Sequence, residues 1–149
     1  MKVRALVKED LPALLELYRH LNPFDAPLPH QQVVDSVWAE SLVNPRMRHF
    51  GGFDSASLVA ACTICAVPNL TRGCRPYALN ENVVTASTHR RRGWGRAVLA
   101  EASAFAWSQD CYKVMLLTGR QDEGVLSFYK ASGFTPDEKK GFVARPARR

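Results

Sequence analysis

The hydrophobic pattern of the N-terminal third predicts one strand and two helices. Val3, Ala5 and Val7 alternate with Lys2, Arg4 and Leu6, as in a short strand. After Asp10, a plausible N-cap, leucines recur at helical spacing, which predicts a helix that packs one face on a sheet. Three prolines between positions 22 and 29 exclude helix there, and a second helix is expected from Gln31 to about Leu42. Its predicted inner face consists of Val34, Val37, Trp38 and Ser41.

The middle of the chain has the pattern of consecutive strands. Residues 47–53 and 56–67 are predicted strands around a turn at positions 54–55. Residues 69–73 have the composition of a loop, and the segment that ends at Thr85 is the next expected strand. This part of the chain is therefore predicted to be a meander.

Helices and strands alternate in the rest of the chain. Apolar residues from Trp94 to Gln109 repeat at the period of an amphipathic helix. We expect a buried strand at 112–118, a helix at 122–132 and a last strand at 142–144. The whole pattern predicts a mixed α/β sheet.

Length and composition are typical of one soluble globular domain spanning residues 1–149. Hydrophobic residues make up 46% of the chain and charged residues 23%. The longest apolar run, Leu58–Val67, contains Thr63 and is about half of the roughly 20 residues that a membrane-spanning helix needs. The first residues lack the apolar core of a signal peptide, so a cytoplasmic protein without membrane contact is expected.

The four cysteines do not form a recognisable metal-binding pattern. Cys62 and Cys65 lie in a predicted strand, where residues three apart point to opposite faces. Neither a second cysteine pair nor a histidine pair stands at zinc-finger spacing. Buried free thiols and no metal are the expectation, and a zinc or redox site is the alternative.

The formal net charge of +6 raises the possibility of nucleic-acid binding. The arginines concentrate in residues 90–96 and in the last residues of the chain, and no known DNA- or RNA-binding motif is present. We therefore expect no nucleic-acid partner and favour an anionic cofactor.

Residues 90–95, Arg-Arg-Arg-Gly-Trp-Gly, stand between a predicted strand and a predicted helix. The first N–H groups of a helix have no intrahelical acceptor, and this end carries partial positive charge. Glycines allow an anion to approach those N–H groups closely. The segment is therefore a candidate phosphate-binding loop.

Arg90, Gly93 and Gly95 resemble the Arg/Gln-x-x-Gly-x-Gly/Ala signature of the GCN5-related N-acetyltransferase (GNAT) superfamily, whose loop binds the pyrophosphate of acetyl-coenzyme A. Residues 81–85 and 112–117 resemble the family's neighbouring strands, and 128–134 resemble its Tyr-x-x-x-Gly-Phe segment. The resemblance implies a mixed, mostly antiparallel sheet of six to seven strands with about four helices.

The resemblance also implies the cofactor contacts. The strand that precedes the loop would separate from its neighbour and offer backbone groups to the pantetheine arm. The expected cofactor-binding residues are Val83, Val84, Thr85, Arg90, Arg91, Arg92, Gly93, Trp94, Gly95 and Arg96. Arg91 replaces a common glycine, and Asp122 stands where an asparagine often contacts the cofactor.

Acetyl transfer to an amine needs a group that accepts the amine's proton and a group that protonates the leaving thiolate. Glu81 opens the cofactor strand and is the candidate base; the alternative is an ordinary exposed glutamate. Tyr129 matches the tyrosine that the family places near the thioester sulfur and is the candidate acid; the alternative is a tyrosine packed on a helix face. The four histidines, including His49, are expected to be surface residues.

The sequence thus predicts an acetyl-CoA-dependent N-acetyltransferase that acts by direct attack in a ternary complex. The expected acceptor is a primary amine of a small molecule, with a protein amine as the less favoured choice. A non-catalytic coenzyme A-binding or sensing module is the alternative function. A homodimer is compatible with the predicted exposed strand edges.

Overall fold

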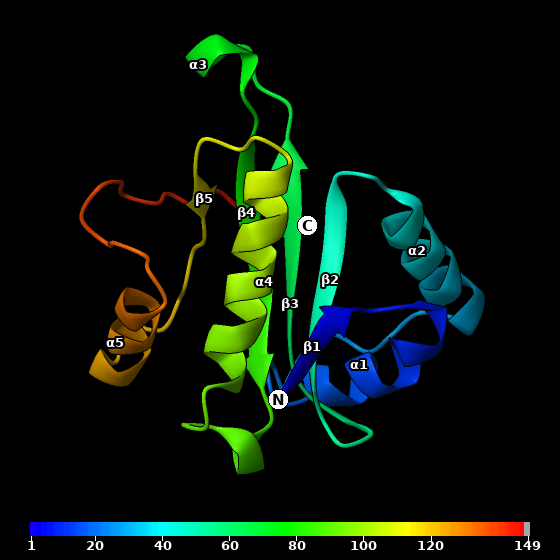
Figure 1. Cartoon of the computed structure of the whole chain (residues 1–149). Coiled ribbons are helices and arrows are strands. Elements are labelled where there is room, and N and C mark those ends of the chain that lie inside the picture. Colours follow the sequence, from blue (N-terminus) through cyan, green and yellow to red (C-terminus); the bar gives the residue numbers. More distant parts are fainter. Residues whose placement is uncertain (148–149) are drawn as a thin grey trace. The chain divides into compact units, whose positions relative to one another are not determined.

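The computed structural model describes residues 1–147 and divides into two compact units, Met1–Leu116 and Leu117–Arg149. The first unit contains every strand of the described residues and most of the helices (Figure 1). Its elements in chain order are β1 (Lys2–Ala5), the 3-10 helix η1 (Lys8–Asp10), α1 (Leu11–Tyr18), α2 (Gln31–Val43), β2 (Met47–Asp54), β3 (Ser57–Val67), α3 (Thr71–Cys74), β4 (Tyr77–Thr85), the 3-10 helix η2 (Ser87–His89), α4 (Trp94–Ser108) and β5 (Val114–Met115).

The sheet has the strand order β1-β2-β3-β4-β5. Neighbouring strands from β1 to β4 are antiparallel, and β5 pairs parallel with β4. The β2–β3 hairpin turns through Ser55, which has a left-handed φ of 55°. The first four strands therefore form the predicted meander.

Helices cover both faces of this sheet. Because side chains alternate along β3, Cys62 and Ile64 join the apolar cluster that includes α4, through Val98. Ala61 joins the opposite cluster, which contains Leu14 of α1 and Trp38 of α2. The sheet is thus the middle layer of a three-layer unit, with α4 on one face and α1 and α2 on the other (Figure 1).

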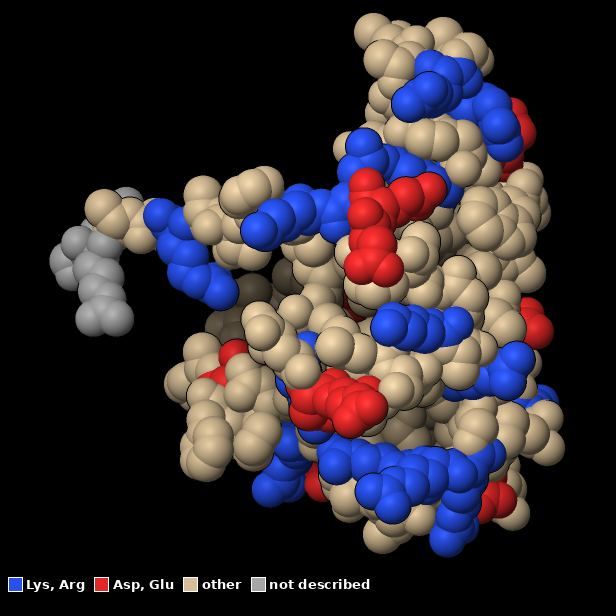
Figure 2. Space-filling model, turned by 90° about the vertical axis from the view of Figure 1, so that its left-hand side faces the viewer, with Lys and Arg blue, Asp and Glu red and all other residues tan. Residues whose placement is uncertain are grey.

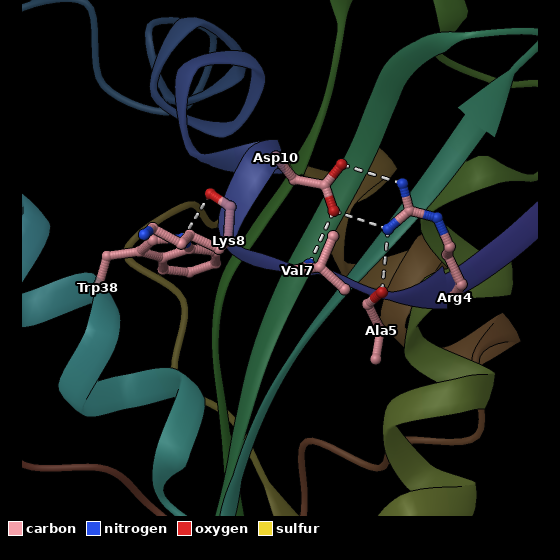
Figure 3. Close-up of polar contacts among 6 residues, drawn as sticks. All are labelled: Arg4, Ala5, Val7, Lys8, Asp10 and Trp38. Carbon is pink, nitrogen blue, oxygen red and sulfur yellow. Dashed lines mark hydrogen bonds and ion pairs between the residues drawn. The ribbon is translucent and has the colours of Figure 1, made fainter.

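A polar network fixes the α1 and α2 side to the start of the chain (Figure 3). The Asp10 carboxylate accepts hydrogen bonds from Arg4 Nη1 and Nη2 at 2.6 and 2.9 Å and from the Val7 N–H at 2.8 Å. Asp10 is the N-cap of α1, as expected, although its side chain binds these groups rather than the helix N–H groups. The carbonyl of Lys8 accepts from the indole Nε1 of Trp38 at 3.2 Å, which joins η1 to α2.

The second unit contains α5 (Glu123–Ala131). Asp122 caps this helix, because its Oδ1 accepts from the Val125 N–H at 3.1 Å. Tyr129 packs against the rings of Phe128 and Phe134, with ring centroids 4.9 and 6.2 Å away. Gly133, at φ 91°, ends the helix in the left-handed conformation that glycine adopts without strain.

Several predicted elements differ from the observed ones. The described residues form a five-stranded sheet and five α-helices, rather than six to seven strands and about four helices. Residues 142–144 are not a strand, and Phe142 and Val143 are 86% and 68% exposed, so no neighbouring strand covers them. The strand expected at 112–118 pairs only at Val114–Met115. The additional helix is α3, a single turn in the predicted loop.

The inner face of α2 was predicted correctly only in part. Trp38 is buried, and Val34 and Ser41 are partly buried. Val37 is 60% exposed and therefore does not face the sheet. Within residues 1–147, no helix is long and apolar enough to cross a membrane.

Candidate active site

Strands β4 and β5 separate soon after they begin to pair. Their register contains only Ala78 opposite Val114 and Leu79 opposite Met115. In the described part of the chain, β4 therefore continues from Asn80 to Thr85 with no strand on that edge. An unpaired edge presents backbone N–H and C=O groups that an extended ligand can bind as an added strand would.

A β-bulge changes the direction of β4 at the same place. Ala61 of β3 pairs with Val84, whereas Thr63 pairs with Glu81, so β4 has one residue more than β3 between these pairs. Asn82 lies in the bulge with a left-handed φ of 53°. The bulge bends the exposed edge next to Glu81.

The predicted cofactor residues of β4 differ in what they can offer to a ligand. Val84 is buried in the cluster on the α1 side, and Val83 packs against the cluster on the α4 side. Thr85 is partly buried at the end of the strand. Since the two valine side chains serve the core, these residues can contact a cofactor mainly through their backbone.

The loop between η2 and α4 contains two left-handed residues, Arg91 at φ 61° and Gly93 at φ 84°. Gly93 is the N-cap of α4, and no side chain caps this helix end. The first helical bond runs from the Ala97 N–H to the Gly93 carbonyl at 3.0 Å. The N–H groups before Ala97 have no intrahelical acceptor, which makes this end of α4 suitable for an anion.

Trp94 anchors the loop to the sheet. Its side chain is 6% exposed and packs closely on Gly52 of β2. A Cβ atom added to Gly52 would lie only 3.0 Å from Trp94 Cε3. Gly95 is also buried. Trp94 and Gly95 are therefore core residues whose N–H groups, rather than side chains, are available to a phosphate.

The arginines of the loop are exposed. Arg90, Arg91, Arg92 and Arg96 all have exposed side chains. Arg90 Nε donates to the Thr85 carbonyl at 3.4 Å and so joins the loop to the end of β4. Figure 2 shows basic side chains gathered at the end of the molecule where η2 and the start of α4 lie in Figure 1. The loop thus combines unpaired N–H groups with positive charge.

The two predicted catalytic residues lie in different units. Glu81 is exposed on β4, directly opposite Thr63 of β3. Tyr129 is partly buried on α5, in the second unit. Asp122 caps α5 through Oδ1 and forms an ion pair with Arg120 Nε through Oδ2 at 3.2 Å. Both oxygens of its carboxylate therefore have partners within the second unit.

Sequence reasoning missed a group of polar residues on the face that α1 and α2 cover. His49 was expected at the surface, but it is half-buried and both of its ring nitrogens have hydrogen-bond partners, Thr63 and Ser41. The side chains of Thr63 and Asn82 interact with Tyr18 of α1 and oppose the rise in its pKa that burial causes. Thr63 inside an otherwise apolar run was the signal in the sequence that could have revealed this group.

A second buried polar residue lies where β4 and β5 separate. Asn80 is 1% exposed, and neither Nδ2 nor Oδ1 has a hydrogen-bond partner among the described residues. Its neighbour Cys62 is buried, and burial raises the pKa of the thiol to about 12. In the described residues, Cys62 and Cys111 are buried free thiols, Cys65 is partly buried and Cys74 is exposed, so the expectation of burial holds for two of the four.

An uncapped helix start beside arginines and a strand that separates from its neighbour are the arrangement expected of an acyl-group-transferring protein. The model of the acetyltransferase (GNAT) family matches residues 11–134, and the chain belongs to this family. The resemblance seen in the sequence is therefore confirmed, and with it an acetyltransferase of the α/β GNAT fold that uses acetyl-CoA. Residues 1–147 contain no group of three or more His, Cys, Asp or Glu side chains that could hold a metal ion.

Known proteins resemble the chain over nearly its whole length. A solved structure from Agrobacterium tumefaciens str. C58, assigned to the acetyltransferases, is 46% identical with a TM-score of 0.90 and covers 98% of this chain and 100% of that one. Glucosamine 6-phosphate N-acetyltransferase of Trypanosoma brucei brucei is 27% identical over 94% of this chain and 92% of its own length. An Arabidopsis thaliana glucosamine-6-phosphate N-acetyltransferase shares the fold, with a TM-score of 0.83 at 19% identity over 96% of this chain and 97% of its own.

Proposed function

We propose that the protein transfers the acetyl group of acetyl-CoA to a primary amine of a small molecule, by direct attack in a ternary complex. One observation carries this proposal: the unpaired edge of β4 runs to the loop that begins α4. The edge offers backbone groups for the pantetheine amides, and the loop offers N–H groups and arginines for the pyrophosphate.

The order of the elements supports one direction for the cofactor. Arg90 joins the loop to Thr85, so the phosphate end of the cofactor belongs near the end of β4. The pantetheine arm would then follow Val83 and Thr85 back towards the bulge. This path brings the thioester close to Glu81.

Glu81 and Tyr129 would handle the protons in this reaction. An acceptor amine is mostly protonated at neutral pH and must lose a proton before it can attack the thioester. The exposed Glu81 carboxylate can accept that proton directly or through a water molecule. The Tyr129 phenol would donate a proton to the departing thiolate of coenzyme A.

An amino sugar is the first acceptor to test. The Trypanosoma relative acts on glucosamine 6-phosphate and resembles this chain over almost its full length, at 27% identity. Glucosamine 6-phosphate, glucosamine and a lysine-containing peptide form a panel that separates a phosphorylated sugar, an uncharged sugar and a protein amine. Release of coenzyme A thiol reports turnover with each.

The cofactor site is tested by calorimetric titration of acetyl-CoA, with desulfo-coenzyme A and ATP for comparison. Gly93→Asp places a carboxylate about 5 Å from the expected phosphate, and at a high effective dielectric constant this costs about 2 kcal/mol, or roughly 30-fold in affinity. Gly73→Asp is the matched control, since Gly73 also has a positive φ (68°) and open space but lies on α3. Equal affinities of the two variants, or no binding by wild type, would contradict the proposed cofactor site.

The catalytic roles are tested on the same protein. Glu81→Gln and Tyr129→Phe should each lower kcat by about 100-fold while the affinity for acetyl-CoA stays within about twofold, because neither change touches the phosphate loop. A coenzyme A-binding module without catalysis would show wild-type binding and no thiol release with any amine. That result would favour the alternative function.

A further inference from the structure

A row of polar side chains crosses three strands on the sheet face that α1 and α2 cover. His49 of β2 pairs with Thr63 of β3, and Thr63 pairs with Glu81 of β4. Residues directly opposite each other in antiparallel strands point to the same face. The row therefore leads from the candidate base at the exposed edge to the half-buried His49.

The hydrogen bonds of this row have a fixed direction. The Ser41 hydroxyl donates its proton to the Trp38 carbonyl at 2.8 Å, so the Ser41 oxygen accepts from His49 Nε2 at 3.0 Å. A neutral imidazole has one N–H, and therefore Nδ1 of His49 accepts from the Thr63 hydroxyl at 2.9 Å. Burial lowers the pKa of His49, which keeps the ring neutral, so that Nδ1 can accept the hydrogen bond of the Thr63 hydroxyl.

Tyr18 extends the row towards the cofactor edge. Its hydroxyl lies near the side chains of Thr63 and Asn82, which lower its pKa and so oppose the effect of burial. Since the Thr63 proton is directed to His49, the Thr63 oxygen can accept a proton from the Tyr18 O–H. Burial is the main reason that the pKa of Tyr18 is raised, so its hydroxyl keeps its proton at neutral pH.

The packing around His49 holds the chain of hydrogen bonds in place. The ring of Trp38 lies over His49, with centroids 4.8 Å apart and the planes tilted by 52°. Trp38 is itself fixed by the hydrogen bond to the Lys8 carbonyl (Figure 3). The one cause of the shifted pKa of His49 is burial, without a contribution from any charged side chain of the described residues.

Acetylation of an ammonium group removes two protons from the acceptor nitrogen, whereas Glu81 accounts for one. The first leaves before attack, and the second leaves once the new N–C bond has formed and the nitrogen has become acidic. On the basis of the proposed function, we propose that Tyr18, Thr63 and His49 form a proton relay that removes this second proton, with His49 as its final acceptor.

The N–C bond forms and the thioester C–S bond breaks; the nitrogen gives its proton to the Tyr18 oxygen, Tyr18 gives its own to Thr63, and Thr63 gives its own to His49 Nδ1. Tyr129 protonates the thiolate and regains a proton from water, while Glu81 and the half-buried His49 release theirs to water. The net products are the amide, coenzyme A thiol and one proton.

The direction of the hydrogen bonds around His49 can be tested without any acceptor amine. In 15N-labelled protein at neutral pH, the ring nitrogens of His49, assigned by comparison with His49→Gln, should show the tautomer that is protonated at Nε2. A ring protonated at Nδ1 would reverse the direction of the hydrogen bonds and overturn the relay, whatever the activity of the protein.

Enzyme kinetics then tests the role of the relay in catalysis. Thr63→Val and Tyr18→Phe should each lower kcat by about 100-fold with glucosamine 6-phosphate, or the first amine of the panel that is acetylated, and leave the KM for acetyl-CoA within about twofold. Thr63→Ser, which keeps the hydroxyl, should restore most of kcat. Thr71→Val on α3 is the matched control and should match wild type.

The two proposals fail in different ways. Wild-type turnover that Thr63→Val leaves unchanged would overturn the relay and leave the proposed function intact. Absence of wild-type turnover with every amine would overturn the function on which the relay rests.

Discussion

The ion pair between Arg4 and Asp10 is expected to stabilise the layer that contains α1 and α2. Asp10→Asn removes the negative charge of the Asp10 carboxylate. This carboxylate accepts three hydrogen bonds, two from Arg4 and one from the Val7 N–H. The asparagine oxygen can still accept one of them. The Asp10 side chain is 11% exposed and that of Arg4 is 36% exposed, so the guanidinium can turn to water after the substitution.

This geometry sets the size of the effect. Loss of one partner of a fully buried pair costs about 3–5 kcal/mol, and exposed pairs contribute about 0–1 kcal/mol. The partly exposed Arg4 places Asp10→Asn between these limits, at about 2 kcal/mol in the free energy of unfolding. For a chain of this size, that corresponds to a Tm lower by roughly 6 °C.

The effect should also depend on pH. The hydrogen bonds from Arg4 are the largest cause that holds the pKa of Asp10 below its usual value of 3.8. A lowered pKa stabilises the folded state above the unfolded-state pKa, and this contribution is lost as the pH falls through the folded-state pKa. The difference between wild type and Asp10→Asn should therefore be full at pH 7 and shrink below about pH 4.

Urea unfolding at several pH values measures the difference directly. Asp110→Asn is the matched control, because the Arg75–Asp110 pair, at 3.1 Å, is solvent-exposed on both sides. We expect the control to change the free energy of unfolding by less than about 0.5 kcal/mol. An equal loss in both variants, or a loss for Asp10→Asn that does not change with pH, would refute the reasoning.

Two further predictions concern the core and the thiols. Leu99→Ala should lower the free energy of unfolding by about 3 kcal/mol, because Leu99 is 1% exposed and its removal leaves a cavity. Leu70→Ala, at a residue 89% exposed, should change it by less than about 0.5 kcal/mol, and urea unfolding that finds equal effects would disprove the predicted packing. With a thiol-specific reagent, Cys74→Ala should remove the fast-reacting thiol, and Cys62→Ala should leave it unchanged, because Cys62 is buried with a pKa of about 12. A fast phase that survives in Cys74→Ala would show that another thiol is accessible.

The parts of the fold that depend on local sequence were predictable. The periodicity of residues 94–109 identified α4, and the glycine next to it marked the start of that helix, because both signals lie within a few residues. The hairpin of β2 and β3 also followed from neighbouring segments. Such elements are determined by residues close together in the chain.

Elements that depend on distant partners were not predictable. The apolar segment 142–144 has the composition of a strand but is not paired, since a strand also needs a neighbour that accepts its hydrogen bonds. β5 is short because β4 departs from it after Leu79. The strand count therefore depended on pairings that the sequence pattern does not contain.

The residues of the candidate site also divide into those that the sequence predicted and those that only the structure revealed. The roles of Glu81 and Tyr129 were read from a motif and stay predictions. The contact of Tyr18 with Thr63, and of Thr63 with His49, joins α1, β3 and β2. Such a group depends on strand register and on helix packing, and one threonine in an apolar run was its only local sign.

The exposed edge of β4 has a consequence for solubility. Free edge strands are templates for association with other chains, and proteins limit this hazard with bulges and charged side chains. The bulge at Asn82 and the charge of Glu81 occupy that edge, so two features that shape the candidate site would also discourage aggregation. A substitution that straightened the bulge and removed the charge together would be expected to yield a protein that polymerises along this strand.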